Sequence, residues 1–305
     1  MTLTDPLRIV VAINPRASFG KNRAVGPAVV DALRAAGHDV TSLLEPDYEQ
    51  LVAATSTAIE ARPDALVVVG GDGMVSLGAN LLAGTTIPLG IVPSGSGNDM
   101  SRGLGIPVGD TDAAIGALLT ALRHPPRAID AGLVRHSDGT QVWFASVLSA
   151  GFDAVVSERA NRMRWPRGRS RYNLALLREL AVLKPIAYRL VLDGVETVTD
   201  AVLVAVANNT SFGGGMLITP EAKLDDGRLD VFVVQPLSRT AFLRIFPRVF
   251  TGSHVTDPRV AIHRARRIRI EADGVVAYAD GERVGPLPVD IEVVPGVLRV
   301  LSPHD

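Results

Sequence analysis

The chain has 305 residues, of which 47% are hydrophobic and 21% charged, and it contains no cysteine. This length suggests two domains, and the composition is that of a folded globular protein without disordered segments. A formal net charge of −1 excludes a global attraction to nucleic acid, and the lack of cysteine excludes disulfides, thiolate metal sites and a cysteine nucleophile.

The N-terminus, residues 1–15, lacks the basic region and the apolar length of a signal peptide. Apolar runs such as residues 201–207 are far shorter than the ~20 residues that a membrane-spanning helix needs. We therefore expect a cytoplasmic protein that meets a membrane only from its surface.

Up to His124, short apolar runs alternate with amphipathic segments. The apolar runs predict strands at residues 8–13, 40–44, 65–69 and 89–92. Helices are predicted at residues 22–36, 48–61, 75–82, 98–104 and 111–122. Strands that alternate with helices indicate a doubly wound parallel sheet, which binds its ligands at the carboxyl ends of the strands.

After His124-Pro125-Pro126 the pattern changes to short strands separated by Asp-Gly turns. The predicted strands are residues 143–148, 188–192, 201–207, 229–234, 266–272 and 290–294. Helices are expected only near residues 172–183 and 238–250. We predict an α/β nucleotide-binding domain at 1–127 and a mainly antiparallel domain, a β-sandwich or barrel, at 128–305.

Two small-residue turns follow neighbouring predicted strands, Gly70-Gly71-Asp72-Gly73 and Pro93-Ser94-Gly95-Ser96-Gly97-Asn98-Asp99. Glycine lets a backbone approach a ligand closely, and a helix that starts after each turn points unsatisfied N–H groups at the same place, which favours phosphate. Asp72 and Asp99 supply the hard oxygen ligands that Mg²⁺ prefers. These turns predict a nucleotide site and make phosphoryl transfer the leading hypothesis.

An ordered set of motifs runs through the whole chain. It comprises Asn14-Pro15, the two turns, Ile129-Asp130, Gly151-Phe152-Asp153, residues 208–220, residues 223–229 and Asp280-Gly281-Glu282. In this order the set resembles the bacterial diacylglycerol kinases and their relatives, the sphingosine and ceramide kinases. The resemblance implies an ATP-dependent transfer of the γ-phosphoryl group to a lipid hydroxyl, most simply from ATP to diacylglycerol to give phosphatidic acid.

The resemblance also implies roles for individual residues, with the nucleotide between the two domains. Nucleotide contacts would come from Asn14, Gly70, Gly71, Asp72, Gly73, Met74, Val75, Ser76, Ser94, Gly95, Ser96 and Asn98. Asp72, Asp99 and Asp130 would form the acidic network around a catalytic Mg²⁺, and Glu282 would be the general base. A structural Mg²⁺ would be held by the Asp226 carboxylate and the backbone carbonyls of Lys223 and Arg228.

Some positions depart from the family pattern, since Met74 stands where the family often has threonine and Ser76-Leu77 stand where Asn-Glu is common. Simpler interpretations also exist: Asp130 and the Asp280–Glu282 segment also fit ordinary turn residues.

A cluster of arginines around Trp165 fits contact with an anionic membrane or a solvated loop. The cluster spans Arg159–Arg171 and includes Arg162, Arg164, Arg167 and Arg169.

Two alternatives to the lipid kinase remain open, an NAD kinase-like enzyme and a non-catalytic nucleotide sensor on the same scaffold. The expected partners are ATP and a lipid substrate at the membrane surface, with no nucleic acid. The lipid acceptor and the oligomeric state, including a homodimer, stay open.

Overall fold

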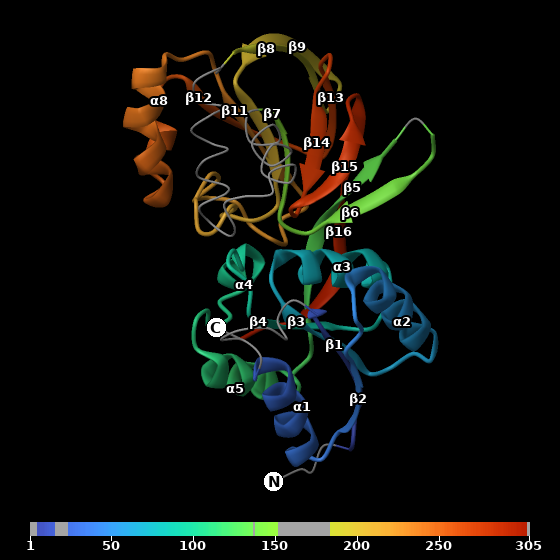
Figure 1. Ribbon diagram of the computed structural model, residues 1–305. Coiled ribbons are helices and arrows are strands. Elements are labelled where there is room, and N and C mark those ends of the chain that lie inside the picture. The colour runs from blue at the N-terminus through green and yellow to red at the C-terminus, as the bar shows by residue number, and fades with distance from the viewer. Residues whose placement is uncertain (1–4, 16–23, 137, 152–183, 304–305) are drawn as a thin grey trace. The chain divides into compact units, whose positions relative to one another are not determined.

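The computed structural model describes residues 5–15, 24–136, 138–151 and 184–303 (Figure 1). The chain divides into two compact units. The first comprises Met1–Ala131, Gly213–Gly215 and Pro295–Asp305, and the second comprises Gly132–Phe212 and Met216–Val294. A single boundary after residue 127 is therefore too simple. The chain returns to the first unit because the end of strand β16 (Val289–Leu301) pairs in parallel with β4 (Leu89–Pro93).

The sheet of the first unit is parallel throughout and has the order β2 (Asp39–Leu43), β1 (Arg8–Ile13), β3 (Ala65–Gly70), β4, end of β16. Every residue of β3 is buried, as expected for a strand of a parallel sheet that is covered on both faces. The predicted doubly wound architecture is confirmed.

Helices follow the strands of the first unit, and α1 lies beside α5 while α2 lies beside α3 (Figure 1). Their bounds are α1 (Val25–Ala35), α2 (Tyr48–Glu60), α3 (Asp72–Leu82), α4 (Asp99–Gly103) and α5 (Thr111–Ala121). Aspartates start two of them: Asp47 caps α2 by accepting from Gln50 N–H at 2.9 Å, and Asp110 caps α5 through Ala113 N–H at 2.9 Å.

The second unit is a sandwich of antiparallel strands. One sheet has the order β12-β11-β10-β7-β14-β15, and the other contains β16-β13-β8-β9 with the β5–β6 pair joined through β16. The bounds are β5 (Arg127–Arg135), β6 (Gln141–Phe144), β7 (Val147–Gly151), β8 (Ile186–Leu192), β9 (Val195–Ala201), β10 (Leu203–Ala207), β11 (Leu229–Val234), β12 (Val260–Ala265), β13 (Arg267–Glu271), β14 (Val276–Ala279) and β15 (Glu282–Pro286).

Both sheets of the second unit contribute to one core. Leu190 and Ile268 from one sheet and Val206 and Val231 from the other belong to a single buried cluster. Apolar side chains alternate inward along the strands, so burial of one face from each sheet holds the two layers together. The predicted β-sandwich is confirmed.

A helical segment follows β11 and consists of α8 (Arg239–Ile245), the 3₁₀ helix η3 (Phe246–Phe250) and the 3₁₀ helix η4 (Ser253–Thr256). Ser238 caps α8 by accepting from Ala241 N–H at 3.2 Å. The α-helix ends before Pro247 because proline has no N–H to donate to the preceding turn. The helix predicted near residues 172–183 lies outside the described residues, and within the described ranges no helix is long and apolar enough to cross a membrane.

Candidate active site

The two small-residue turns lie side by side at the carboxyl ends of β3 and β4. The strands pair in parallel with Gly70 opposite Pro93, and Ser94 N–H donates to the Gly70 carbonyl at 2.8 Å. A Cβ built on Gly95 would lie 2.4 Å from the Gly71 Cα. Glycine is required here because the two backbones touch.

Asp72 joins the two turns through backbone hydrogen bonds. Its Oδ2 accepts from Asn98 N–H at 2.9 Å and its Oδ1 from Asp99 N–H at 2.8 Å. These amides open α4, so a carboxylate from α3 caps the neighbouring helix. A Cβ on Gly97 would lie 2.1 Å from the same carboxylate, which explains the glycine at that position.

The environment of Asp72 shifts its titration. Burial is the main cause that raises the pKa of Asp72, and the nearby Asp99 carboxylate raises it further. The hydrogen bonds from the Asp99 and Asn98 amides act in the opposite direction. The charged form is thus held by backbone donors against a neighbour of like charge, an arrangement that a bound cation relieves.

Asn98 gives the second turn its shape. It has a left-handed backbone, with φ of +58°, which asparagine tolerates better than most residues. Its Oδ1 accepts from Gly95 N–H at 3.0 Å and its Nδ2 donates to the Gly95 carbonyl at 2.8 Å. The side chain is buried and engaged within the turn, so its described role is to hold the loop.

Asp99 is only 4% exposed and fastens a distant loop to the first unit. Its Oδ2 accepts from Gly214 N–H and its Oδ1 from Gly215 N–H, both at 2.7 Å. Gly213, Gly214 and Gly215 all have positive φ, which glycine adopts without strain. Sequence reasoning gave these glycines no individual role, although three consecutive glycines are a signal for such a backbone.

Asp130 lies on β5 and is 2% exposed. Its Oδ1 accepts from Gly296 N–H at 2.8 Å, which ties β5 to the turn within β16. Within the described ranges, no group of three or more His, Cys, Asp or Glu side chains is arranged to hold a metal. The structure therefore brings Asp72 and Asp99 together but forms no metal cluster of all three aspartates. Mg²⁺ often takes one or two carboxylates and completes its shell with phosphate and water. The Asp72–Asp99 pair offers such carboxylates, although the Arg102 guanidinium lies 3.4 Å from Asp99 Oδ1 and already balances part of their charge.

Other predicted nucleotide contacts have buried side chains. Met74, Val75 and Ser76 lie in the first turns of α3, and Met74 and Val75 donate their N–H groups to the Gly71 carbonyl. The Met74 side chain packs against Gly70, where a Cβ would meet its Cγ at 2.3 Å. The helix begins at Asp72 rather than at the predicted residue 75, so these amides belong to the helical ladder. The backbone N–H groups of Gly71, Asp72 and Gly73 come before the first hydrogen bonds of that ladder.

The remaining predicted contacts lie on strand ends and turns of the first unit. Asn14 follows β1 and donates its N–H to the Val69 carbonyl at 3.0 Å, which places it next to the end of β3. Ser96 is exposed at the tip of the second turn, and Ser94 is half-buried at its start. Asn14 and Ser94 thus adjoin the end of β3 that bears Asp72.

Glu282 is the exposed first residue of β15, in the second unit. Before it, Asp280 has a left-handed backbone with φ of +49° and is buried. The Asp280 carboxylate accepts three backbone N–H groups, from Ala145 at 2.9 Å and from Ser146 and Val147 at 3.0 Å. Asp280 is therefore an anchor for the turn, and Glu282 is presented beyond it with its carboxylate accessible.

The loop predicted to hold a structural Mg²⁺ has a different partner. Asp226 Oδ1 accepts from Arg228 N–H at 3.1 Å, and its Oδ2 pairs with the Arg264 guanidinium. Arg264 lies opposite Asp230 in the β11–β12 register, and burial raises the pKa of Asp230 to about 6 against the effect of Arg264. A cation at Asp226 would have to displace this guanidinium. The site at Asp226, Lys223 and Arg228 stays a prediction.

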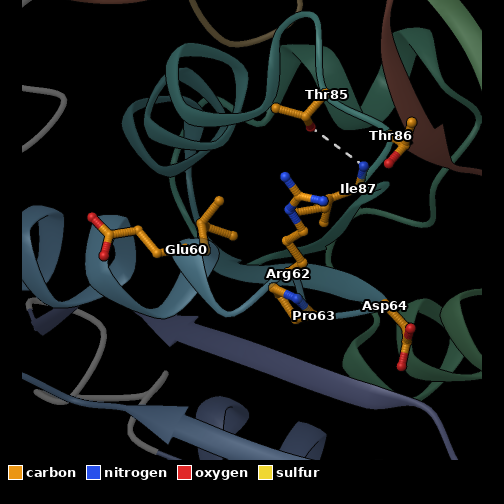
Figure 2. A pocket seen from close by; sticks show the side chains of 8 residues that line it. Glu60, Arg62, Pro63, Asp64, Thr85, Thr86 and Ile87 are labelled. Atoms are coloured by element: carbon orange, nitrogen blue, oxygen red, sulfur yellow. Dashed lines mark hydrogen bonds between the residues drawn. The ribbon is translucent and has the colours of Figure 1, made fainter.

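A pocket of about 790 Å³ lies near the N-terminal ends of β3 and β4. Figure 2 shows the side chains that line it. It is lined by Ile59, Glu60, Arg62, Pro63, Asp64, Thr85, Thr86 and Ile87. Asp64 directly precedes β3 and Ile87 comes shortly before β4, whereas the two turns follow these strands. The pocket is therefore separate from the site that the turns form. The basic cluster Arg159–Arg171 lies outside the described residues.

Comparisons with known proteins agree with this geometry. The family model described as diacylglycerol kinase catalytic domain matches residues 8–134, and that of the YegS C-terminal NAD kinase beta sandwich-like domain matches residues 146–302. A diacylglycerol kinase of Mycobacterium tuberculosis (strain ATCC 25618 / H37Rv) is 40% identical, over 97% of this chain and 96% of its own. A probable lipid kinase YegS-like of Stenotrophomonas maltophilia is 31% identical over 84% of each chain.

Solved structures show the same fold. A putative diacylglycerol kinase from Bacillus anthracis str. Sterne has a TM-score of 0.77 and 25% identity over 98% of each chain. An NAD kinase from Archaeoglobus fulgidus in complex with ATP has a TM-score of 0.54 over 96% of this chain and 92% of its own, and its 15% identity shows likeness of fold alone. From its family matches and its relatives, the chain belongs to the diacylglycerol kinase and YegS-like lipid kinase family.

Proposed function

We propose that the protein is an ATP- and Mg²⁺-dependent lipid kinase that transfers the γ-phosphoryl group of ATP to the hydroxyl of diacylglycerol. The observation that carries this proposal is the Asp72 carboxylate, which holds both glycine turns in one arrangement and lies beside Asp99. Phosphoryl transfer needs positioning and charge compensation more than covalent chemistry. The turns would position the nucleotide, and the two carboxylates would hold the Mg²⁺ that compensates its charge. The names of the relatives support the acceptor class.

Each part of the arrangement has a role in the proposed reaction. Backbone N–H groups at Gly71–Gly73 bind phosphate oxygens at the end of β3, since the amides of Ser94, Gly95, Asn98 and Asp99 in the second turn already have acceptors within the protein. Asp72 and Asp99 would hold Mg²⁺, which would neutralise charge on the phosphates. Glu282 takes the proton from the lipid hydroxyl, and Asp280 fixes the turn that carries it.

The direct test is transfer of labelled γ-phosphate by the purified chain in mixed micelles. The acceptors are diacylglycerol, monoacylglycerol, a sphingoid base, ceramide and phosphatidylglycerol, with NAD as a further acceptor. Labelled phosphatidic acid from diacylglycerol alone is the expected result. Transfer to a different lipid would correct the acceptor while keeping the reaction.

Two other outcomes would contradict the proposal. Labelled NADP would favour the NAD kinase-like alternative, whose fold this chain shares. ATP binding without transfer to any acceptor would favour a nucleotide sensor on this scaffold.

A further inference from the structure

Three large apolar side chains are exposed within the helical segment that follows β11. Leu243 in α8 is 57% exposed, Phe250 at the end of η3 is 51% exposed, and Val255 in η4 is 39% exposed. We call residues 239–256 the α8–η4 surface. Exposed apolar side chains grouped on one segment are typical of an interaction site, whereas scattered ones are ordinary.

The inner side of this segment is firmly packed. Ile245, Val249 and His254 are buried, and Val249 belongs to an apolar cluster that includes Phe232. His254 Nε2 contacts the Ile218 carbonyl at 3.1 Å and its ring meets Phe232 edge-on. The segment is therefore held to the sandwich from below, so its exposed side chains stand on a fixed base.

A row of aromatic rings connects this base with the exposed face. Phe242 stacks on Phe246 with ring centroids 5.4 Å apart, and Phe246 meets Phe250 edge-on at 6.0 Å. Arg248 Nη2 donates to Thr256 Oγ1 at 2.7 Å and so ties η3 to η4. Phe250 is thus held in an exposed position by its neighbours and is not a loose tip.

The charge of the segment identifies the kind of partner. Residues 231–256 contain no Asp or Glu, and the next residue, Asp257, is buried and pairs with Arg259 and Arg248. Arg239 and Arg244 are exposed on α8. Exposed valines also occur on β9, at Val195 and Val198, but acidic Glu196 lies between them. Apolar and aromatic side chains beside arginines, without acidic residues, complement an anionic lipid surface. Strand β9 does not fit such a surface, because acidic Glu196 lies between its exposed valines.

We propose that the α8–η4 surface docks this protein onto an anionic membrane. Leu243, Phe250 and Val255 enter the boundary between headgroups and acyl chains, and Arg239 and Arg244 meet lipid phosphates. The inference extends the proposed function, because a lipid acceptor has to be reached from a bilayer. It assigns the contact to described residues outside the Arg159–Arg171 cluster.

Vesicle flotation of the full chain tests the apolar part. Equimolar phosphatidylglycerol–phosphatidylcholine vesicles are compared with vesicles of phosphatidylcholine alone. The double variant Leu243→Glu/Phe250→Glu should bind the anionic vesicles about tenfold more weakly or worse, because two inserted apolar side chains are replaced by anions. The matched control, Val195→Glu/Val198→Glu, adds the same charge at exposed valines and should bind like the wild type.

The electrostatic part has its own variant. Arg239→Ala/Arg244→Ala should weaken binding by about fivefold for each arginine and flatten its dependence on salt. Arg135→Ala/Arg267→Ala is the control, because these exposed arginines both approach Glu292 within the sheet that does not contain β11. All four variants should keep the thermal unfolding temperature of the wild type and its turnover with a short-chain, water-soluble acceptor.

Two outcomes would overturn the inference, and a third would contradict only the proposed function. Wild-type vesicle binding by both α8–η4 variants would show that the membrane contact lies elsewhere. A changed oligomeric state in Leu243→Glu/Phe250→Glu, with vesicle binding intact, would make the surface an interface between copies of the chain. A wild-type protein that binds vesicles through this surface but phosphorylates no lipid would contradict the proposed function alone.

Discussion

At the scale of single residues, the aspartates of the candidate site do structural work as well as chemical work. Asp72, Asp99 and Asp280 each accept at least two backbone N–H groups from another segment of the chain. A carboxylate is suited to this because its two oxygens accept several donors, and bonds to a charged acceptor are stronger than neutral ones. Variants at these positions therefore need controls that separate lost structure from lost chemistry.

Asp72→Ala should abolish turnover while the protein stays folded with reduced stability. The two amides that open α4 lose a charged acceptor, which costs about 1–3 kcal/mol in the free energy of unfolding. The measurement pairs labelled-phosphate transfer with urea denaturation. Asp110→Ala removes a cap on α5, away from the turns, and should lower stability by about 1 kcal/mol with turnover retained. Equal turnover in the two variants would remove Asp72 from the reaction.

Glu282→Gln should lower kcat by about 10²–10⁴-fold without lowering the unfolding temperature, because the side chain is exposed and is proposed as the base. Asp280→Asn should instead reduce stability, since its carboxylate holds three buried amides. Steady-state kinetics over a range of pH and thermal unfolding measure the two effects. Glu196→Gln, another exposed carboxylate in the second unit, is the control. Wild-type kcat in Glu282→Gln would contradict a role as base.

At the scale of elements, the site depends on two strand–turn–helix units that touch through glycine. The second turn is held from within by Asn98 and from the first turn by Asp72, which caps the helix that follows. The contact follows from the parallel pairing of β3 and β4, which ends both strands at one edge of the sheet.

Gly95→Ala should destabilise the first unit and weaken ATP binding, because the added methyl group would meet the Gly71 backbone at 2.4 Å. Backbone cannot move aside as a flexible side chain can, so a loss of about 1–3 kcal/mol is expected. Gly116→Ala in α5 is the control: nothing lies within 4 Å of its Cβ, and the variant should gain up to about 1 kcal/mol. ATP titration and urea denaturation measure both. Unchanged ATP affinity in Gly95→Ala would show that close contact of the turns is not needed.

The segment of α8, η3 and η4 should loosen in mild acid. Burial lowers the pKa of His254, and the positive charge of Arg248 acts in the same direction. The unfolded chain then binds a proton that the folded chain does not, so stability falls as pH drops below about 6.5, by up to about 1.4 kcal/mol per pH unit. His254→Gln should reduce this slope in denaturation measured between neutral and mildly acidic pH. An identical slope would assign the acid sensitivity to other groups.

At the scale of the whole molecule, the chain leaves the first unit and comes back to it twice. Gly213–Gly215 is fastened by Asp99, and the end of β16 pairs with β4. The first unit is therefore completed by residues from late in the chain. The stability of the proposed site therefore depends on Gly213–Gly215 and on the end of β16, which a single boundary after residue 127 would place in the second domain.

Leu298→Ala should lower the urea midpoint of the unfolding transition that ATP raises. Leu298 is fully buried in the part of β16 that belongs to the first unit, and removal of such a side chain costs about 2–5 kcal/mol. The exposed neighbour Arg299 provides the control variant, Arg299→Ala, with a midpoint near that of the wild type. If Leu298→Ala left the urea midpoint of this ATP-sensitive transition unchanged, β16 would not contribute to the stability of the proposed nucleotide site.

By itself, the sequence determined the alternation of strands and helices in the first half, the doubly wound class, the β-rich second half and the two glycine turns. It missed β5, β9, β12, β14 and β15, and it predicted one strand at residues 143–148 where β6 ends and β7 begins. Apolar periodicity and glycine chemistry are local, so they can be read from neighbouring residues. Local reasoning also has limits within a turn: it started α3 at residue 75, whereas the helix begins at Asp72 and takes the amides of Met74 and Val75 into its ladder.

Only the tertiary structure decided which groups meet. Asp99 accepts hydrogen bonds from the Gly214 and Gly215 amides, and Asp280 accepts from the amides of residues 145–147. Arg264 pairs with Asp226. These contacts join segments far apart along the chain, and they follow from strand register and chain return, which no local pattern encodes. The sequence names the carboxylates of the candidate site, and the long-range pairing of the strands sets the backbone donors that hold each one in place.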